Sequence, residues 1–262
     1  MSILFLDTSL QIERLIGPNP RQVTIEHQLA ASDLQAMTSR YVLMEFQRSV
    51  WSDYVRVYNH VLQHDHWEAA VQALRSGILA YRPRSLGRCM QILTQTMIVS
   101  RLERDHGLDL LETQIARDLP TRFWRHVTSL SDPIDCDLVT AGVRRRPDGS
   151  YTIADTCRKE TAACRLPDFL AGHQAKLRAL ADHLAAHSNV IKDQPRVERL
   201  LVTVLANPHA ALGQSACWPL GDVILTLQAP PEAALWTLDP DFDPLAAALG
   251  RRLYHTLQIT TP

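Results

Sequence analysis

The chain has 262 residues, of which 46% are hydrophobic, so it can bury a full-sized core in one elaborated domain or in two small ones. Its 27 basic and 28 acidic residues give a net charge of −1, which excludes a global attraction to nucleic acid or to a membrane surface. The opening "MSILFLDTSL" has no basic leader and reaches an acid after a short apolar run, so we expect neither a signal peptide nor a membrane span there. The 5 unevenly spaced cysteines do not fit a secreted disulfide framework, and we expect a cytoplasmic protein.

The N-terminal half begins with a strand pattern and continues with a helix pattern. "SILFLDTS" predicts a buried strand that ends at Asp7, followed by a helix N-cap. A polar stretch containing proline, "GPNPRQVTIEHQ", comes next and predicts no regular element. From about Ser39 to Leu62, apolar side chains recur at helical spacing, and Glu45 lies at the edge of this stripe. The stripe consists of Val42, Phe46, Val50, Tyr54, Val57 and Val61.

The middle of the chain predicts helices and one hairpin. Amphipathic helices are expected from about His66 to Leu130, with breaks at "YRPRSLG", at Gly107 and at "LPTR". Two β-prone stretches then flank Pro-Asp-Gly and predict a β-hairpin at about 136–157. Helices are expected again at about Leu166 to His187 and at about Pro195 to Leu205.

The segment "GDVILTLQAPPEAALWTLDPDFDPLAAALG", residues 221–250, carries four aspartates among mostly apolar residues. Its first part fits either a helix that starts at Asp222 or a short buried strand. "AALWTLD" predicts a strand that ends at Asp239, and "PLAAALGRRL" predicts a helix that Gly250 closes and that Asp243 caps. Acids therefore recur where strands end or helices begin, which is where open parallel sheets build their sites.

These segments resemble the PIN-domain nucleases, which include the toxin ribonucleases of bacterial toxin–antitoxin pairs. The resemblance rests on "LFLDTS", on Glu45 within "YVLMEFQRSV" and on residues 221–250, and it covers roughly residues 1–50 and 215–255. It implies a PIN-like α/β core with a central parallel sheet flanked by helices. The metal-binding acids that it implies are Asp7, Glu45, Asp222 and Asp239, with Thr237 and Asp241 supporting them.

The expected domain organisation follows from the same segments. Residues 1–50 and 190–262 would form the discontinuous core, and residues 51–189 would form a mainly helical insertion that carries the hairpin. This insertion is far longer than the corresponding part of the small toxin members, so toxin biology does not follow from the resemblance.

The chemistry of phosphodiester hydrolysis explains why such a site needs acids. Four carboxylates gathered without a cation would repel one another, whereas Mg²⁺ or Mn²⁺ binds hard oxygen ligands and activates a water. We therefore expect a metal-dependent endoribonuclease, with RNA as substrate and, by the resemblance, an inhibitory antitoxin protein as partner. A catalytically inactive PIN-like module that binds RNA or protein is the alternative, as is a structural partner protein. Each acid taken singly also fits a cap, a turn or a solvated surface.

Convergence of the acids is the geometric expectation. Asp7, Glu45, Asp222 and Asp239 should meet at the C-terminal edge of the sheet, with carboxylates about 4–8 Å apart. Replacing Asp239 by asparagine should then abolish cleavage without loss of stability.

The cysteines suggest a second, structural metal. Cys136 and Cys157 are centred beside the Pro-Asp-Gly turn, and Cys164 follows closely, so a hairpin would bring three thiols together. With His173 as fourth ligand, or less favourably Asp135 or Cys89, they would bind Zn²⁺ and pin a hairpin too small to hold itself. Buried thiols, or a disulfide between Cys136 and Cys157, are the alternatives.

Candidate phosphate contacts are local arginine clusters. They are Arg144, Arg145 and Arg146 near the hairpin tip, Arg82, Arg84 and Arg88 in a loop containing proline, and Arg251 with Arg252. Solvated surface charge is the alternative for each cluster.

Overall fold

The computed structural model describes residues 2–17, 19–30, 34–77, 83–136, 142–154, 157, 164–211 and 217–254. The chain divides into two compact units. The first unit comprises Met1–Leu43, His126–Asp137 and Thr156–Pro262, and the second comprises Met44–Arg125 and Leu138–Asp155.

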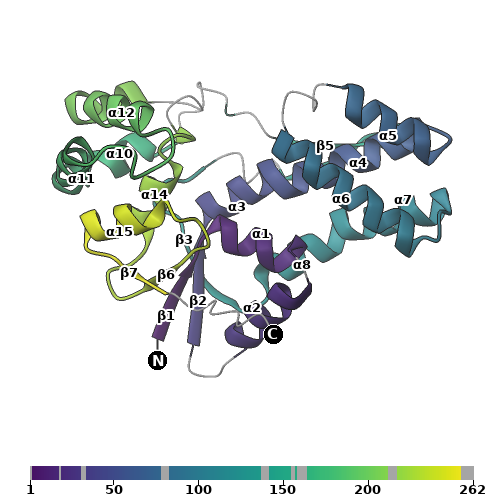
Figure 1. The fold of residues 1–262 in the computed structure, drawn as a ribbon, viewed down its shortest axis with the longest axis horizontal. Coiled ribbons are helices and arrows are strands. Elements are labelled where there is room, and N and C mark those ends of the chain that lie inside the picture. The colour runs from purple at the N-terminus through teal and green to yellow at the C-terminus, as the bar shows by residue number, and fades with distance from the viewer. Residues whose placement is uncertain are drawn as a thin grey trace. The chain divides into compact units, whose positions relative to one another are not determined.

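The first unit contains a five-stranded sheet in which every neighbouring pair of strands is parallel (Figure 1). The strand order is β3-β2-β1-β6-β7. The strands are β1 (Ser2–Leu6), β2 (Leu34–Ser39), β3 (Val127–Ser131), β6 (Ala234–Trp236) and β7 (Arg252–Leu253). Leu4 of β1 lies opposite Ala36 of β2 on one side and Ala234 of β6 on the other. The expected α/β class with a central parallel sheet is therefore confirmed.

Helices flank this sheet, and their bounds follow the chain. They are α1 (Thr8–Ile16), α2 (Asn19–Leu29), α3 (Arg40–Phe46), α10 (Leu166–Ala171), α11 (Gln174–Ala186), α12 (Gln194–Ala206), the 3₁₀ turn η4 (Pro208–Ala211), α14 (Gly221–Gln228) and α15 (Phe242–Leu249). The segment that begins near Asp222 is thus a helix. The predicted strand at the N-terminus and the predicted helices after Leu166 are confirmed.

The core explains one helix that the sequence pattern did not predict. Leu4 and Leu6 of β1 are almost completely buried, because helices cover both faces of a parallel sheet. Ile25 and Leu29 of α2 join this core cluster, although the polar residues around them hide the helical period. Burial of two apolar side chains therefore outweighs the weak amphipathic pattern of α2.

The start of α15 corrects the predicted cap. The helix begins at Phe242, so Asp241 is the N-cap residue and Asp243 lies in the first turn. Phe242 is 1% exposed, and its packing in the core brings the helix start forward. At the other end, Gly250 closes the helix with a φ of +62°, as predicted.

The second unit is mainly helical. Its elements are the π-helical turn η1 (Gln47–Trp51), α4 (Ser52–Gln63), α5 (Trp67–Ser76), α6 (Pro83–Val99), α7 (Arg104–Thr113), the π-helical turn η3 (Gln114–Asp118), α8 (Leu119–Trp124) and the strands β4 (Val143–Arg145) and β5 (Tyr151–Ile153). The helical run α3-η1-α4 matches the predicted helix, and every residue of its predicted apolar stripe is buried.

The division into units differs from the expected one in two places. Residues 127–131 were expected to be helical, but they form β3 and extend the parallel sheet of the first unit. Residues 166–186 were assigned to the insertion, but α11 packs against α12 and α15 and belongs to the first unit. Both segments follow their tertiary partners, which local composition does not reveal.

Gly107 is not a helix break, since it lies inside α7. A Cβ at this position would lie 2.5 Å from Cη2 of Trp67. The indole is 6% exposed, and its Nε1 donates a hydrogen bond of 2.9 Å to the carbonyl oxygen of Leu102. The glycine therefore allows a close approach of α7 to a fixed aromatic ring.

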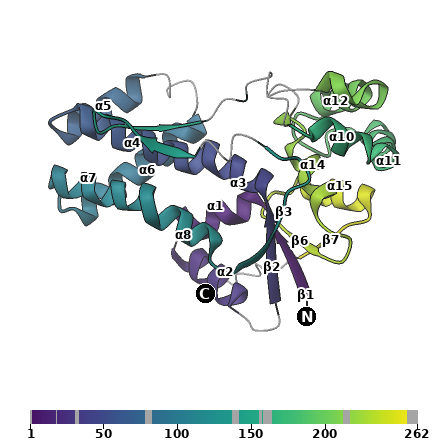
Figure 2. The same ribbon diagram turned by 180° about the vertical axis from the view of Figure 1, so that it is seen from behind.

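The predicted hairpin is confirmed, and a side chain holds it in place. Its strands are antiparallel around Pro-Asp-Gly, with Arg145 opposite Tyr151. Strand β5 runs beside α4 (Figures 1 and 2), where Asn59 pairs with the backbone of Tyr151 in both directions. The Asn59 Nδ2 donates to the Tyr151 carbonyl oxygen, and its Oδ1 accepts from the Tyr151 N–H, both at 2.8 Å. The amide thus takes the place of a neighbouring strand.

Within the described ranges, none of the helices has both the length and the apolar composition that crossing a membrane would require.

Two glycines in helices should respond oppositely to alanine. Gly107→Ala should destabilise the protein by about 1–3 kcal/mol, because the new methyl group overlaps the Trp67 ring. Gly87→Ala, in α6, should stabilise it by about 0.5–1 kcal/mol, because a Cβ there meets no atom within 4 Å. Urea unfolding of both variants measures the difference, and equal effects would contradict the role given to Trp67.

Candidate metal centre

The candidate site lies at the point where the sheet changes its winding direction. From β1 the chain continues to β2 and β3 on one side, whereas β6 and β7 extend the sheet on the other side. Loops that follow two strands at such a switch point diverge and leave a crevice beyond their carboxyl ends. Here these loops carry Asp7, directly after β1, and Thr237 to Asp241, directly after β6.

Asp7 caps the helix that follows the first strand, as predicted. Its carboxylate accepts hydrogen bonds from the backbone N–H of Ser9 and, at 2.8 Å, from the Ser9 hydroxyl. Its own N–H donates to the carbonyl oxygen of Trp236 at 3.2 Å, which continues the pairing of β1 with β6. The side chain is 2% exposed.

Burial dominates the electrostatics of Asp7. Loss of hydration raises its pKa from 3.8 to about 6, and the nearby charge of Asp239 acts in the same direction. Hydrogen bonds from Thr237 and Ser9 stabilise the ionised form, but they offset only part of the cost of burial.

Ser9 and Thr237 join the two loops. The Ser9 Oγ accepts from the backbone N–H of Leu238 at 2.9 Å and lies 3.3 Å from the Thr237 Oγ1. The Thr237 Oγ1 in turn accepts from the backbone N–H of Asp239 at 3.0 Å. These contacts fix the loop after β6 relative to Asp7. Sequence reasoning missed Ser9, although its position two residues after a capping aspartate is a recognisable signal.

Three aspartates form the acidic cluster of the site. Asp222, Asp239 and Asp241 are half-buried, and one carboxylate oxygen of each lies within 4.8 Å of the other two. Among the described residues, this is the one group of three or more acids, histidines or cysteines with ligand atoms so close together. Asp241, expected only to support the site, is thus a full member, whereas Asp7 lies beside the cluster.

The cluster suits a hard divalent cation. The Asp239 Oδ1 accepts from the backbone N–H of Asp241, and the Asp241 Oδ2 accepts from the backbone N–H of Lys192, both at 3.1 Å. Each of these carboxylates therefore keeps one oxygen for a cation. Within the described chain, no lysine or arginine forms an ion pair with Asp239 or Asp241. Mg²⁺ or Mn²⁺ would neutralise the cluster and complete its coordination with water.

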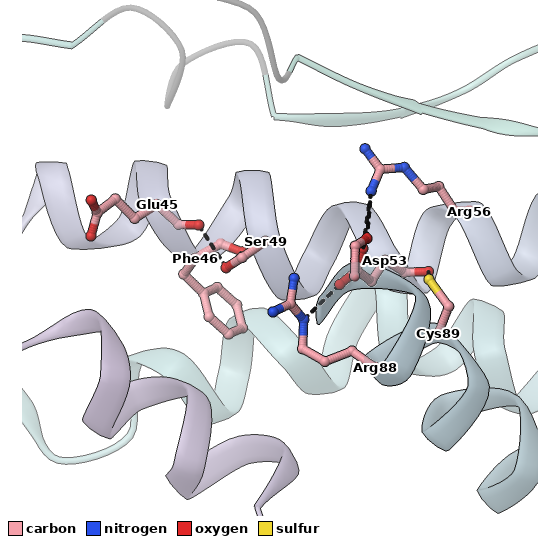
Figure 3. Close-up of polar contacts among 8 residues, drawn as sticks. Glu45, Phe46, Ser49, Asp53, Arg56, Arg88 and Cys89 are labelled. Atoms are coloured by element: carbon pink, nitrogen blue, oxygen red, sulfur yellow. Dashed lines mark hydrogen bonds and ion pairs between the residues drawn. The ribbon is translucent and has the colours of Figure 1, made fainter. Parts of the chain in front are cut away.

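Glu45 lies on α3 but belongs to the second unit. It is half-buried, and its carbonyl oxygen accepts a hydrogen bond of 2.7 Å from the Ser49 hydroxyl (Figure 3). Its convergence with the acids of the first unit stays a prediction. In the first unit, the Ser39 Oγ accepts from the backbone N–H of Val42 at 3.2 Å and so caps the helix that carries Glu45.

A separate charged network in the second unit accounts for Arg88. Figure 3 shows Arg56 and Arg88 converging on Asp53, which is fully buried. The Arg88 Nε lies 2.7 Å from Asp53 Oδ2, and the Arg56 Nη1 lies 3.0 Å from Oδ1. Arg88 was expected in a loop as a phosphate contact, but it lies on α6 and neutralises a buried carboxylate.

The other arginine candidates divide into two kinds. Arg145 is exposed and pairs with Glu112 at 2.7 Å, and its neighbours Arg144 and Arg146 are exposed on the hairpin. Arg251 instead donates hydrogen bonds of 3.2 Å to the carbonyl oxygens of Thr226 and Leu227. It therefore satisfies the C-terminal end of α14, and this contact corrects its assignment as a phosphate contact. Arg82 lies outside the described residues.

The cysteine hypothesis receives no geometric support. None of the five cysteines, all of which the structure describes, forms a disulfide bond. Among the described residues, Cys136, Cys157, Cys164 and His173 do not form a group with ligand atoms close enough to share one ion. The hairpin register is centred on Asp148, so it does not place Cys136 opposite Cys157.

Comparison with protein-family models, with curated proteins and with solved structures returned no match for this chain.

Replacement of Asp7 should change the pH dependence of stability. Because the folded-state pKa lies above the unfolded value, the folded protein retains this proton while the unfolded chain releases it. Between about pH 4 and pH 6 the wild type should lose roughly 3 kcal/mol relative to Asp7→Asn, and the difference should stay constant at higher pH. Urea unfolding across this range, with a chelator present, measures it; a constant difference would contradict the assignment.

Divalent cations should stabilise the protein through the acidic cluster. Mn²⁺ should raise the Tm of the wild type by several degrees, since binding at about 100 times Kd adds about 2.7 kcal/mol. Asp239→Asn should remove most of this shift and should itself stabilise the metal-free protein by relieving repulsion. Asp243→Asn, an exposed aspartate on the same helix start, is the matched control and should retain the shift. Equal shifts in both variants would exclude the cluster as the binding site.

Proposed function

We propose that the protein is a metal-dependent nuclease with a PIN-like core that hydrolyses phosphodiester bonds in RNA, probing its substrate as an endonuclease. The observation that supports this proposal most is the position of the acidic cluster. Asp222, Asp239 and Asp241 come from two segments of the chain and gather beside Asp7 at the switch point of a parallel sheet. Structural carboxylates have no need to gather in this way, since their mutual repulsion is unfavourable without a cation.

The residues of this chain have distinct roles in the proposed reaction. A bound Mg²⁺ or Mn²⁺ would supply an activated water and would neutralise charge on the phosphate and on the leaving oxygen. Asp222, Asp239 and Asp241 hold the cation. Asp7 holds Thr237 and Ser9, and through them it fixes the loop that carries Asp239. Glu45 would complete the set of acids, and hydrolysis would leave a 5′-phosphate.

An inactive module that binds RNA or protein is the second candidate. The observation that favours it is the complete hydrogen bonding of Asp7 by Ser9 and Thr237, which gives this acid a structural role without any metal. An antitoxin partner belongs to the toxin version of the proposal and rests on the family resemblance alone.

A cleavage assay separates the two candidates. Purified full-length protein with Mn²⁺ or Mg²⁺ should cleave single-stranded RNA, and a chelator should abolish the activity. Asp239→Asn should lower the rate at least about 100-fold, as expected for removal of an electrostatic group in a hydrolytic site, whereas Asp243→Asn should cleave at the wild-type rate. If the wild type binds RNA without cleaving RNA or DNA under any of these metal conditions, the nuclease proposal is wrong and the module is favoured.

A further inference from the structure

Trp218 is an exposed aromatic residue close to the acidic cluster in sequence and in structure. Its side chain is 38% exposed, whereas Trp236, the other tryptophan of the first unit, is 1% exposed. Trp218 precedes Asp222 by four positions, so their Cα atoms lie within about 14 Å of each other even if the chain between them were extended. The chain in fact turns there, because the Gly221 N–H donates a hydrogen bond of 3.1 Å to the Trp218 carbonyl oxygen.

The backbone beside Trp218 is held in place by a buried tyrosine. The hydroxyl of Tyr41, which is 1% exposed, donates a hydrogen bond of 2.8 Å to the carbonyl oxygen of Cys217. The indole therefore projects from a fixed segment. A rigid aromatic side chain loses little conformational entropy when a flat ligand stacks on it.

Lys192 supplies a positive charge at the edge of the same cluster. Its backbone N–H donates to Asp241, as described above, and its side chain is exposed. The turn that carries it is braced by Gln194, which is 4% exposed and whose Nε2 donates to the carbonyl oxygens of Leu184 and His187 at 2.8 and 2.7 Å. The start of the lysine side chain is thus fixed next to a proposed metal ligand.

An aromatic surface and an ammonium group beside a cation site suit one class of ligand. Single-stranded nucleic acids are bound by stacking of bases on aromatic side chains and by basic groups that contact the phosphates. The span from Trp218 to Asp222 corresponds to a few nucleotides. We propose that Trp218 and Lys192 hold single-stranded nucleic acid across the acidic cluster, with one base stacked on the indole and one phosphate on the ammonium group. The placement of the scissile bond at the cluster rests on the proposed function.

Equilibrium binding in the presence of chelator tests this proposal without cleavage. The probe is a fluorescein-labelled single strand of about 12 nucleotides, within the usual site size, followed by anisotropy and prepared as RNA and as DNA. Trp218→Leu should weaken binding about 5- to 100-fold, and Trp218→Phe should restore most of the affinity. On a strand whose bases are replaced by abasic spacers, Trp218→Leu and the wild type should bind equally. Lys192→Gln should reduce the slope of log K against log salt by about 0.7.

The chain offers matched controls for both substitutions. Trp124 is 39% exposed and lies in the second unit, so Trp124→Leu removes an equally exposed indole away from the acidic cluster. Lys176 is an exposed lysine of α11, and Lys176→Gln removes the same charge. Both controls should bind like the wild type.

The outcomes separate this proposal from the nuclease proposal. If the wild type does not bind the strands, if Trp218→Leu binds like Trp124→Leu, or if its loss persists on the abasic strand, base stacking at Trp218 is wrong. Metal-dependent cleavage together with any of these results would leave the nuclease proposal standing. Binding that depends on Trp218, without cleavage by the wild type, would instead overturn the nuclease proposal and keep the stacking role. Equal binding of RNA and DNA would assign the recognition to bases and phosphates rather than to the 2′-hydroxyl group.

Discussion

The pairing of β1 with β6 is the contact on which the candidate site depends. It joins Leu4 to Ala234 and Leu6 to Trp236, residues that are far apart in the chain. The hydrogen bond from the Asp7 N–H to Trp236 continues this pairing, and the contacts of Ser9 with Thr237 and Leu238 extend it into the loops. The acidic cluster is therefore a property of the sheet edge, and neither terminal segment contains it alone. Any change that shifts the β1–β6 register would move Asp7 away from the loop after β6.

Sequence patterns were sufficient where local signals and burial agree. The N-terminal strand is short and wholly apolar, Asp7 precedes Thr-Ser in a good capping context, and Gly250 follows an apolar helix, so all three were predictable. The late aspartates could be assigned to a site because they recur at ends of elements. Their detailed roles were not predictable, since the contribution of Asp241 depends on the conformation of the turn that also contains Asp239.

Other features could not be predicted because distant partners determine them. The segment from Val127 to Ser131 has a mixed composition, and it becomes a strand because the edge of β2 offers backbone hydrogen-bonding groups to pair with. Gly107 has the composition signal of a break, but the nearby ring of Trp67 explains it. The hairpin shows the same limitation. A metal ion was one plausible way to hold so small a sheet, whereas the amide of Asn59 holds it by pairing with the backbone of Tyr151.

The separation of the cluster along the chain has a consequence for the order of events during synthesis. A ribosome releases Asp7 and β1 early, while Asp222, Asp239 and Asp241 emerge only after most of the chain has been made. Until β6 docks against β1, the nascent protein has no gathered carboxylates and so cannot retain a divalent cation at this position. A hydrolytic centre arranged in this way would stay silent beside the messenger RNA and the ribosome throughout translation, and it would become active only in the finished molecule.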